Sequence, residues 1–122
     1  MPLILVADDD PAYVSMMTGC LQSDGYEVEA ISDAGQLDAK LAARGFNAAI
    51  LDMQMPMGGG VAAVKRIRAH YAHVTIPIII CSGMPAERAG EWFKGIPKLT
   101  VFQKPPNFPA LLAELKRLLS EP

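Results

Sequence analysis

Five short apolar runs alternate along the chain with segments whose apolar residues recur every three or four positions. The runs are LILVA (residues 3–7), YEVEAI (26–31), AAIL (48–51), IPIIIC (76–81) and LTVFQ (99–103). Runs of this length bounded by glycine, proline and polar residues are typical of β-strands, and those without polar alternation predict strands buried on both faces. This strict alternation predicts a doubly wound α/β fold, with one five-stranded parallel sheet and helices on both of its faces.

The segments between the runs carry recognisable helix signals. Pro11 suits the first turn of a helix that Ser23-Asp24-Gly25 ends. Ser32 or Asp33 can cap a second helix, which Gly45 closes. Further helices are expected over residues 61–70, 86–94 and 108–119, the last with Asn107 as its cap. Pro77 cannot donate to a sheet ladder, so it is expected among the first residues of its strand.

Length and composition limit the class of protein. A chain of 122 residues predicts a single domain over residues 1–122, and its net charge of −2 argues against direct nucleic-acid binding. No apolar run is long enough for a membrane span, and no charged signal-peptide region precedes the first run. Cys20 and Cys81 lack the spacing of a metal site or a disulfide framework. We therefore expect a cytoplasmic protein with reduced thiols.

Polar side chains stand at the carboxyl ends of four of the five predicted strands. They are Asp8 and Asp9 after the first strand, Asp52 after the third, Ser82 after the fourth and Lys104 after the fifth. The carboxyl ends of parallel strands lie at one edge of a sheet, so these side chains are expected to converge. Three crowded carboxylates repel one another unless a cation joins them, and all-oxygen ligation with open positions suits Mg²⁺.

The same edge can handle a phosphoryl group. Lys104 supplies a mobile positive charge for an anion, and Ser82 can hydrogen-bond a phosphoryl oxygen. Asp52 is available as a carboxylate nucleophile, a role that acids fill by forming aspartyl phosphate. Each residue also has a simpler interpretation: Asp10 is better explained as a helix-capping acid, Ser82 alone as a turn former and Lys104 alone as a solvated charge. Their joint occurrence at successive strand ends favours a shared site.

These motifs resemble the receiver domain of bacterial two-component response regulators over essentially the whole chain. The matching pieces are LILVADDD, ILDMQMP followed by Gly60, IIICS and QKP. The resemblance implies a flavodoxin-like sheet with strand order 2-1-3-4-5. It also implies that Asp52 is the phospho-acceptor and that Mg²⁺ is held by Asp9 directly, Asp8 largely through water, Asp52 and the backbone carbonyl of Gln54.

The resemblance further implies how the signal is passed on. Ser82 corresponds to the residue that reports phosphorylation and Lys104 to the phosphate contact, with a cis Lys104-Pro105 peptide bond. A receiver takes its phosphoryl group from a sensor histidine kinase or a phosphotransfer protein, loses it by slow hydrolysis and switches its protein partners as a monomer or weak dimer. It is not a turnover enzyme.

The sequence departs from the family pattern at the signalling step. Receivers that swing an aromatic side chain usually carry it three residues before the lysine, where this chain has Val101 beside Phe102. Gly83 stands where alanine is common, and Gly95-Ile96-Pro97 replaces a common Gly-Ala turn. A binding-only pseudo-receiver with an altered switch is therefore an alternative.

Two other interpretations are weaker. An aspartate-nucleophile phosphatase needs a second acid two residues beyond the nucleophile, and that position is Gln54. A flavin protein would need a phosphate-binding loop after the first strand, and none is present. Among the remaining features, Met53, Met55 and Met57 are interpreted as loop and core packing. His70 and His73 are interpreted as favourable charges near a helix end, while Trp92 and Phe93 suit either the core or an exposed partner contact.

Overall fold

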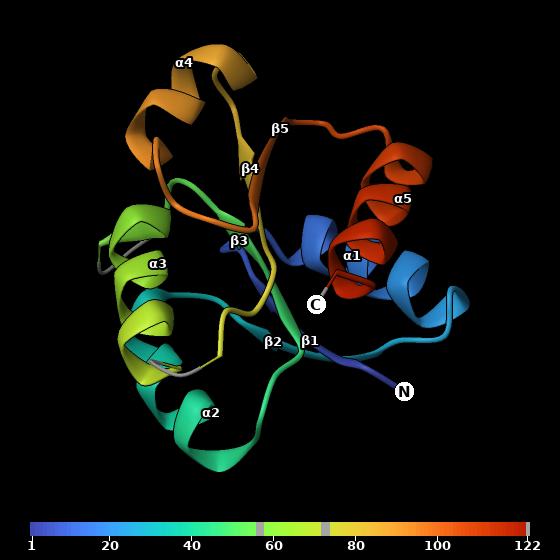
Figure 1. Cartoon of the computed structure of the whole chain (residues 1–122). Helices are drawn as coiled ribbons and strands as arrows, with labels where there is room; N and C mark the ends of the chain where they lie inside the picture. Colours follow the sequence, from blue (N-terminus) through green and yellow to red (C-terminus); the bar gives the residue numbers. More distant parts are fainter. Residues whose placement is uncertain (56–57, 72–73, 122) are drawn as a thin grey trace.

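A central parallel sheet is flanked by helices on both faces in the computed structural model, which describes residues 1–55, 58–71 and 74–121 (Figure 1). The strand order is β2-β1-β3-β4-β5, and every neighbouring pair is parallel. The strands are β1 (Leu3–Ala7), β2 (Glu27–Ile31), β3 (Ala48–Asp52), β4 (Ile78–Ser82) and β5 (Leu99–Gln103). The predicted doubly wound fold and its strand order are confirmed.

The helices divide between the two faces of the sheet (Figure 1). They are α1 (Pro11–Ser23), α2 (Leu37–Ala43), α3 (Gly59–His70), α4 (Ala86–Gly90) and α5 (Phe108–Leu119), with 3-10 turns η1 (Ala34–Gln36) and η2 (Glu91–Phe93). Helices α1 and α5 cover one face, and α2, α3 and α4 lie on the other. Among the described residues no helix combines the length and apolarity needed to cross a bilayer.

Each face of the sheet has its own apolar core. The core beneath α1 and α5 includes Met17, Leu21, Leu111, Leu115 and Leu118. The core on the opposite face includes Leu37, Leu41, Ile67, Phe93 and the loop residue Met55. Every residue of β1, β3 and β4 is buried, as expected for central strands of a parallel sheet. The ends of these strands are therefore held in place by packing on both sides.

The helix caps agree with the sequence signals. Asp10 caps α1 by accepting hydrogen bonds from the backbone N–H groups of Ala12 and Tyr13. Asp33 caps η1, which leads into α2, and Asn107 caps α5 through the N–H of Ala110. The capping role preferred for Asp10 is confirmed in geometry.

Several boundaries differ from the prediction. Helix α3 begins at Gly59 rather than Val61, because the glycines belong to its first turn. Strand β4 begins after Pro77, whose carbonyl accepts a hydrogen bond from the N–H of Ala49 at 3.0 Å although the proline cannot donate one. The helix expected over residues 86–94 breaks at Gly90, a weak helix former, and continues as the tighter turn η2. Gly45 lies beyond α2, which already ends at Ala43.

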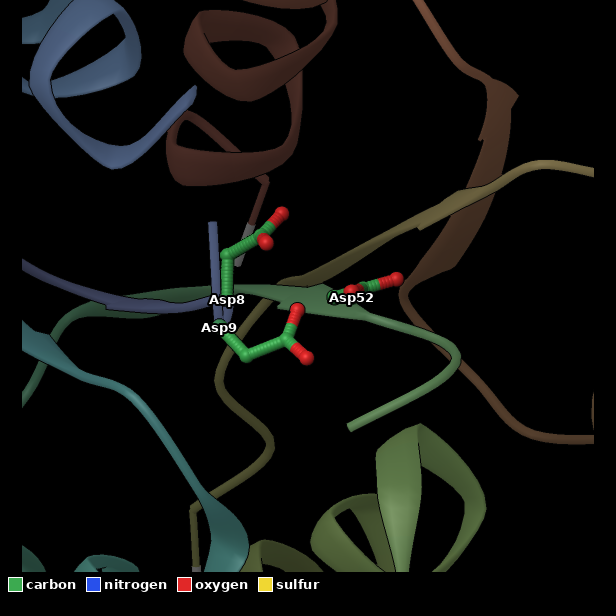
Figure 2. Close-up of side chains that lie close together, drawn as sticks. All are labelled: Asp8, Asp9 and Asp52. Carbon is green, nitrogen blue, oxygen red and sulfur yellow. The ribbon is translucent and has the colours of Figure 1, made fainter. Parts of the chain in front are cut away.

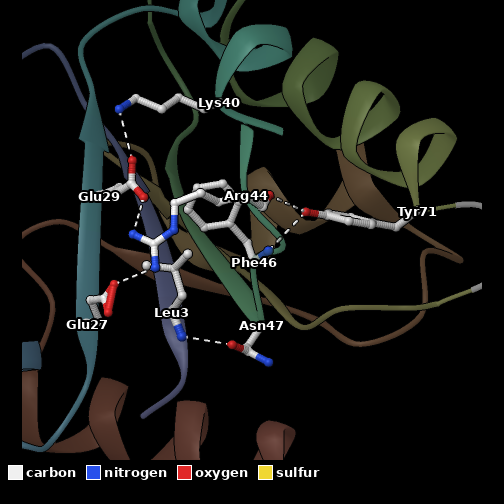
Figure 3. Close-up of polar contacts among 8 residues, drawn as sticks. All are labelled: Leu3, Glu27, Glu29, Lys40, Arg44, Phe46, Asn47 and Tyr71. Carbon is white, nitrogen blue, oxygen red and sulfur yellow. Dashed lines mark hydrogen bonds and ion pairs between the residues drawn. The ribbon is translucent and has the colours of Figure 1, made fainter. Parts of the chain in front are cut away.

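Charged side chains link the edge strand β2 to α2 (Figure 3). Lys40 donates to Glu29 at 3.0 Å, and Arg44 pairs with Glu29 at 2.7 Å and with Glu27 at 2.6 Å. Charged residues on an edge strand discourage pairing with a further strand. The network therefore both ties α2 to the sheet and protects its open edge.

This network predicts a modest acid sensitivity of folding. The hydrogen bond from Lys40, followed by that from Arg44, lowers the pKa of Glu29. A lowered folded-state pKa adds stability above the ordinary glutamate pKa of about 4.3, and that stability is lost as the pH falls through the folded-state value. Glu29→Gln should therefore reduce the free energy of unfolding at neutral pH by less than about 1 kcal/mol, because the pairs are partly exposed and solvent screens them.

Urea unfolding of wild type and Glu29→Gln across the acid range measures this effect. The difference between them should disappear at the lowest pH. The exposed acid Glu91 has no ion pair among the described residues, so Glu91→Gln is the matched control and should show no such trend. A Glu29→Gln difference that is independent of pH would contradict an ionic role for the network.

Candidate functional site

Three carboxylates meet at the carboxyl edge of the sheet (Figure 2). Asp8 and Asp9 directly follow β1, and Asp52 is the last residue of β3. Strands β1 and β3 are adjacent and parallel, with Ala7 opposite Leu51, so their next residues leave the sheet side by side. One carboxylate oxygen from each acid lies within 4.8 Å of the others. The structure thus brings the three predicted acids together.

The two buried acids are oriented by the backbone. Asp8 and Asp52 are buried, whereas Asp9 is exposed. Asp8 Oδ1 accepts a hydrogen bond from the N–H of Asp10 at 2.9 Å, and Asp52 Oδ1 accepts one from the N–H of Gln54 at 3.1 Å. Each buried carboxylate is therefore fixed through Oδ1, and its Oδ2 meets the lysine described next.

Lys104 contacts both buried acids. It directly follows β5, and its Nζ lies 2.7 Å from Asp8 Oδ2 and 3.4 Å from Asp52 Oδ2. Its backbone N–H donates to the carbonyl of Ser82 at 2.7 Å, which fixes the start of the side chain. One ammonium group against three carboxylates leaves an excess of negative charge, so the site suits an additional cation.

Burial and charge act on these groups in opposite directions. Burial raises the pKa of Asp52, and the nearby Asp8 carboxylate raises it further, while the Gln54 N–H and Lys104 lower it. Burial would lower the pKa of Lys104, but its contacts with Asp8 and Asp52 outweigh burial and raise that pKa. The lysine is therefore firmly held as a cation beside a carboxylate whose ionised form is disfavoured.

Ser82 completes the row of polar strand ends. It is the last residue of β4 and is buried, and its Oγ accepts a hydrogen bond from the N–H of Met84 at 3.1 Å. The sheet register places Cys81 opposite Asp52 and Ser82 opposite Gln103, so Ser82 lies between the strand ends that carry Asp52 and Lys104. Its hydroxyl proton is not used by the bond from Met84.

The first turn of α3 lies close to the backbone of Met53, the residue that follows Asp52. Gly60 donates its N–H to the carbonyl of Met53 at 2.9 Å. A Cβ added at Gly59 would lie 2.7 Å from that same carbonyl oxygen, and Gly59 has a positive φ of 67°. Met53 and Met55 pack against the core, as predicted, while Met57 lies outside the described residues. Glycine is therefore needed where the first turn of α3 meets the backbone of Met53.

One side chain at the site was not singled out as functional from the sequence. The ring of Tyr13, on the first turn of α1, has its centroid 4.3 Å from Lys104 Nζ. The sequence placed Tyr13 only among the apolar positions of the first helix. Its position four residues after Asp9 was the available signal, because the start of α1 lies beside the carboxyl end of β1.

The other sequence expectations have clear outcomes. The Lys104-Pro105 peptide bond is cis, as implied. Val101 packs against the core beneath α2 and α3, whereas Phe102 packs against the core beneath α1 and α5. Phe93 is buried while Trp92 is 65% exposed, so the two aromatic residues divide between the alternatives. His70 is the exposed last residue of α3, and His73 lies outside the described residues.

Comparison with known proteins agrees with this geometry. The family model described as the response regulator receiver domain matches residues 4–116. The chain belongs to this family. Receiver domains are signalling modules of two-component systems, and they generally bind Mg²⁺ at an acidic cluster, which Asp8, Asp9 and Asp52 form here.

Two curated relatives of this receiver domain are named as transcriptional regulatory proteins. It is 28% identical over 121 residues to the phosphate regulon transcriptional regulatory protein PhoB of Rhizobium meliloti (strain 1021), covering 98% of this chain and 52% of PhoB. It is 30% identical over 118 residues to the transcriptional regulatory protein ZraR of Escherichia coli O157:H7, covering 96% of this chain and 26% of ZraR. The chain thus spans about half or less of these relatives.

Solved structures show the same fold. The chemotaxis protein CheY4 of Vibrio cholerae superimposes on this receiver with a TM-score of 0.85 at 29% identity, covering 97% of this chain and 98% of CheY4. The sheet order and helix arrangement described above are those of a flavodoxin-like receiver.

Proposed function

We propose that this receiver accepts a phosphoryl group on Asp52 from the phosphohistidine of a sensor kinase or phosphotransfer protein. The observation that carries the proposal is the meeting of Asp8, Asp9, Asp52 and Lys104 at one edge of the sheet. A lone buried acid at a strand end would fit many roles. A buried acid with two acidic neighbours and a shared ammonium group fits the transfer of a phosphoryl group.

The residues present fit a bound Mg²⁺ ion. All the donors are oxygens, and the three carboxylates are close enough together to share one ion. We propose that Asp8, Asp9 and Asp52 hold the ion with the backbone carbonyl of Gln54. When bound, Mg²⁺ would neutralise charge on the phosphoryl oxygens, and it would offset both the burial and the repulsion from Asp8 that disfavour the ionised form of Asp52.

The transfer step uses Asp52 as the nucleophile. A carboxylate oxygen of Asp52 forms a bond to phosphorus while the P–N bond to the donor histidine breaks, and its electron pair returns to the imidazole ring. Lys104 already contacts Asp52 and can move from Asp8 to a phosphoryl oxygen. Ser82 can donate its hydroxyl proton to another phosphoryl oxygen while still accepting from Met84.

Ser82 and Lys104 would transmit phosphorylation of Asp52 to the rest of the protein. Drawing Ser82 and Lys104 toward the phosphoryl group shifts the loops that follow β4 and β5, which alters the surface presented to a partner. Slow attack by water would later remove the group, so the protein acts as a switch. We place this exchange in the cytoplasm, where the free thiols of Cys20 and Cys81 would stay reduced.

Incubation with acetyl phosphate and Mg²⁺ tests the proposal. Intact-protein mass spectrometry should show one added phosphoryl group, and chelation of the metal with EDTA should prevent its addition. Sustained hydrolysis of a generic phosphate ester would instead favour the phosphatase alternative. A protein that binds Mg²⁺ but takes up no phosphoryl group would be a binding-only pseudo-receiver, and the proposal would be wrong.

A further inference from the structure

The ammonium group of Lys104 has an aromatic neighbour as well as two acidic ones. Tyr13 belongs to the first turn of α1, and its ring centroid lies 4.3 Å from Lys104 Nζ. The same ring lies near Phe108, the first residue of α5, at a centroid distance of 6.5 Å and in a tilted arrangement. The Tyr13 ring is thus close both to Lys104 and to the start of α5.

The hydroxyl of Tyr13 does not account for this placement. Tyr13 Oη is buried and makes no hydrogen bond of ordinary geometry with the residues that the structure describes, although the weakly hydrogen-bonding Cys81 thiol of β4 interacts with it. What the side chain offers to Lys104 is the face of its ring, which carries partial negative charge and attracts a cation. The ammonium group therefore has three favourable contacts, namely Asp8 Oδ2, Asp52 Oδ2 and the Tyr13 ring.

We infer that Tyr13 is a positioning residue that holds Lys104 within reach of a phosphoryl group on Asp52. This inference rests on the proposed function. A ring face attracts an ammonium group without demanding one hydrogen-bond direction. Lys104 can therefore exchange the Asp8 oxygen for a phosphoryl oxygen while it stays on the ring. With the ring absent, the contacts of the ammonium group that remain among the described residues are those with Asp8, at 2.7 Å, and with Asp52, at 3.4 Å.

A double-mutant cycle separates positioning from simple packing. Tyr13→Phe keeps the ring and removes only the hydroxyl, so its rate of phosphorylation by acetyl phosphate should stay within about twofold of wild type. Tyr13→Leu removes the ring face and should slow the reaction by about 3- to 30-fold. In a Lys104→Ala background, the same Tyr13→Leu change should have almost no further effect, because the group it positions is gone.

A Tyr13→Leu effect of equal size in both backgrounds would show a packing role and overturn the inference. So would a Tyr13→Leu rate equal to that of wild type. Circular dichroism identifies any variant that fails to fold, and Tyr13→Met then replaces Tyr13→Leu as the variant without a ring.

An NMR measurement on the unmodified wild-type protein tests the contact without any phosphorylation. The Lys104 side-chain protons nearest Nζ should be shifted upfield by the Tyr13 ring and should return toward ordinary values in Tyr13→Leu. Unshifted protons in wild type would overturn the inference by themselves. If the shift is present but acetyl phosphate never modifies the wild type, the proposed function fails while the Tyr13–Lys104 contact stands.

Discussion

Asp52→Asn should reduce phosphoryl incorporation from acetyl phosphate and Mg²⁺ by at least about 100-fold. The amide is close in size to the carboxylate but has no anionic oxygen to bond to phosphorus. Asp52 is buried at the end of β3, where the backbone N–H of Gln54 and the ammonium group of Lys104 orient its two oxygens. The loss should therefore appear in the chemical step, which quenched-flow labelling followed by intact-protein mass spectrometry would measure.

Asp38→Asn is the matched control for this experiment. Asp38 is an exposed acid in the first turn of α2 and does not belong to the cluster of Asp8, Asp9 and Asp52, so its replacement should leave incorporation unchanged. Incorporation in Asp52→Asn at the wild-type level would show that another residue accepts the group. That result would remove Asp52 from the mechanism.

The second large effect concerns protein stability and the close contact between Gly59 and Met53. Gly59→Ala should lower the free energy of unfolding by roughly 2–4 kcal/mol, from two causes. The positive φ of 67° disfavours any residue with a Cβ, and that Cβ would lie 2.7 Å from the backbone oxygen of Met53. Because Met53 directly follows Asp52, displacement of its backbone should also slow phosphorylation. Chemical denaturation monitored by circular dichroism measures the stability change.

Gly19→Ala should change the free energy of unfolding in the opposite direction. Gly19 lies within α1, and a Cβ added there meets nothing within 4 Å. Alanine is the better helix former, so this variant should gain about 0.5–1 kcal/mol. Equal effects of the two substitutions on the free energy of unfolding would contradict the close approach of Gly59 to the backbone of Met53.

Most of the fold could be predicted from the sequence because apolar residues recur with different spacings in strands and in helices. The uninterrupted apolar runs marked the buried strands β1, β3 and β4, and Asp10 and Asn107 marked two helix starts. The strand order came from family resemblance, since periodicity does not distinguish between the possible arrangements of parallel strands. The start of α3 was misplaced because glycine usually signals a loop, whereas Gly59 and Gly60 are used here for close backbone contact.

The candidate site was predictable in its members but not in its contacts. The rule that parallel strand ends share one edge was sufficient to group Asp8 with Asp52 and Lys104. It could not show that Lys104 pairs more closely with Asp8 than with Asp52, because that depends on the path of a flexible side chain. Nor could it show that the Tyr13 ring meets the lysine, because this depends on where the start of α1 lies relative to Lys104 and to α5.

A crystal structure of the protein with Mg²⁺ and beryllofluoride, which mimics a phosphoryl group, tests the central claim most directly. We predict the beryllofluoride on the Asp52 carboxylate, the metal ion between Asp8, Asp9 and Asp52, and both Lys104 Nζ and Ser82 Oγ within hydrogen-bond distance of the fluorine atoms. A mimic bound at another acid, or a Lys104 that stays on Asp8 and leaves the fluorine atoms facing solvent, would contradict the account.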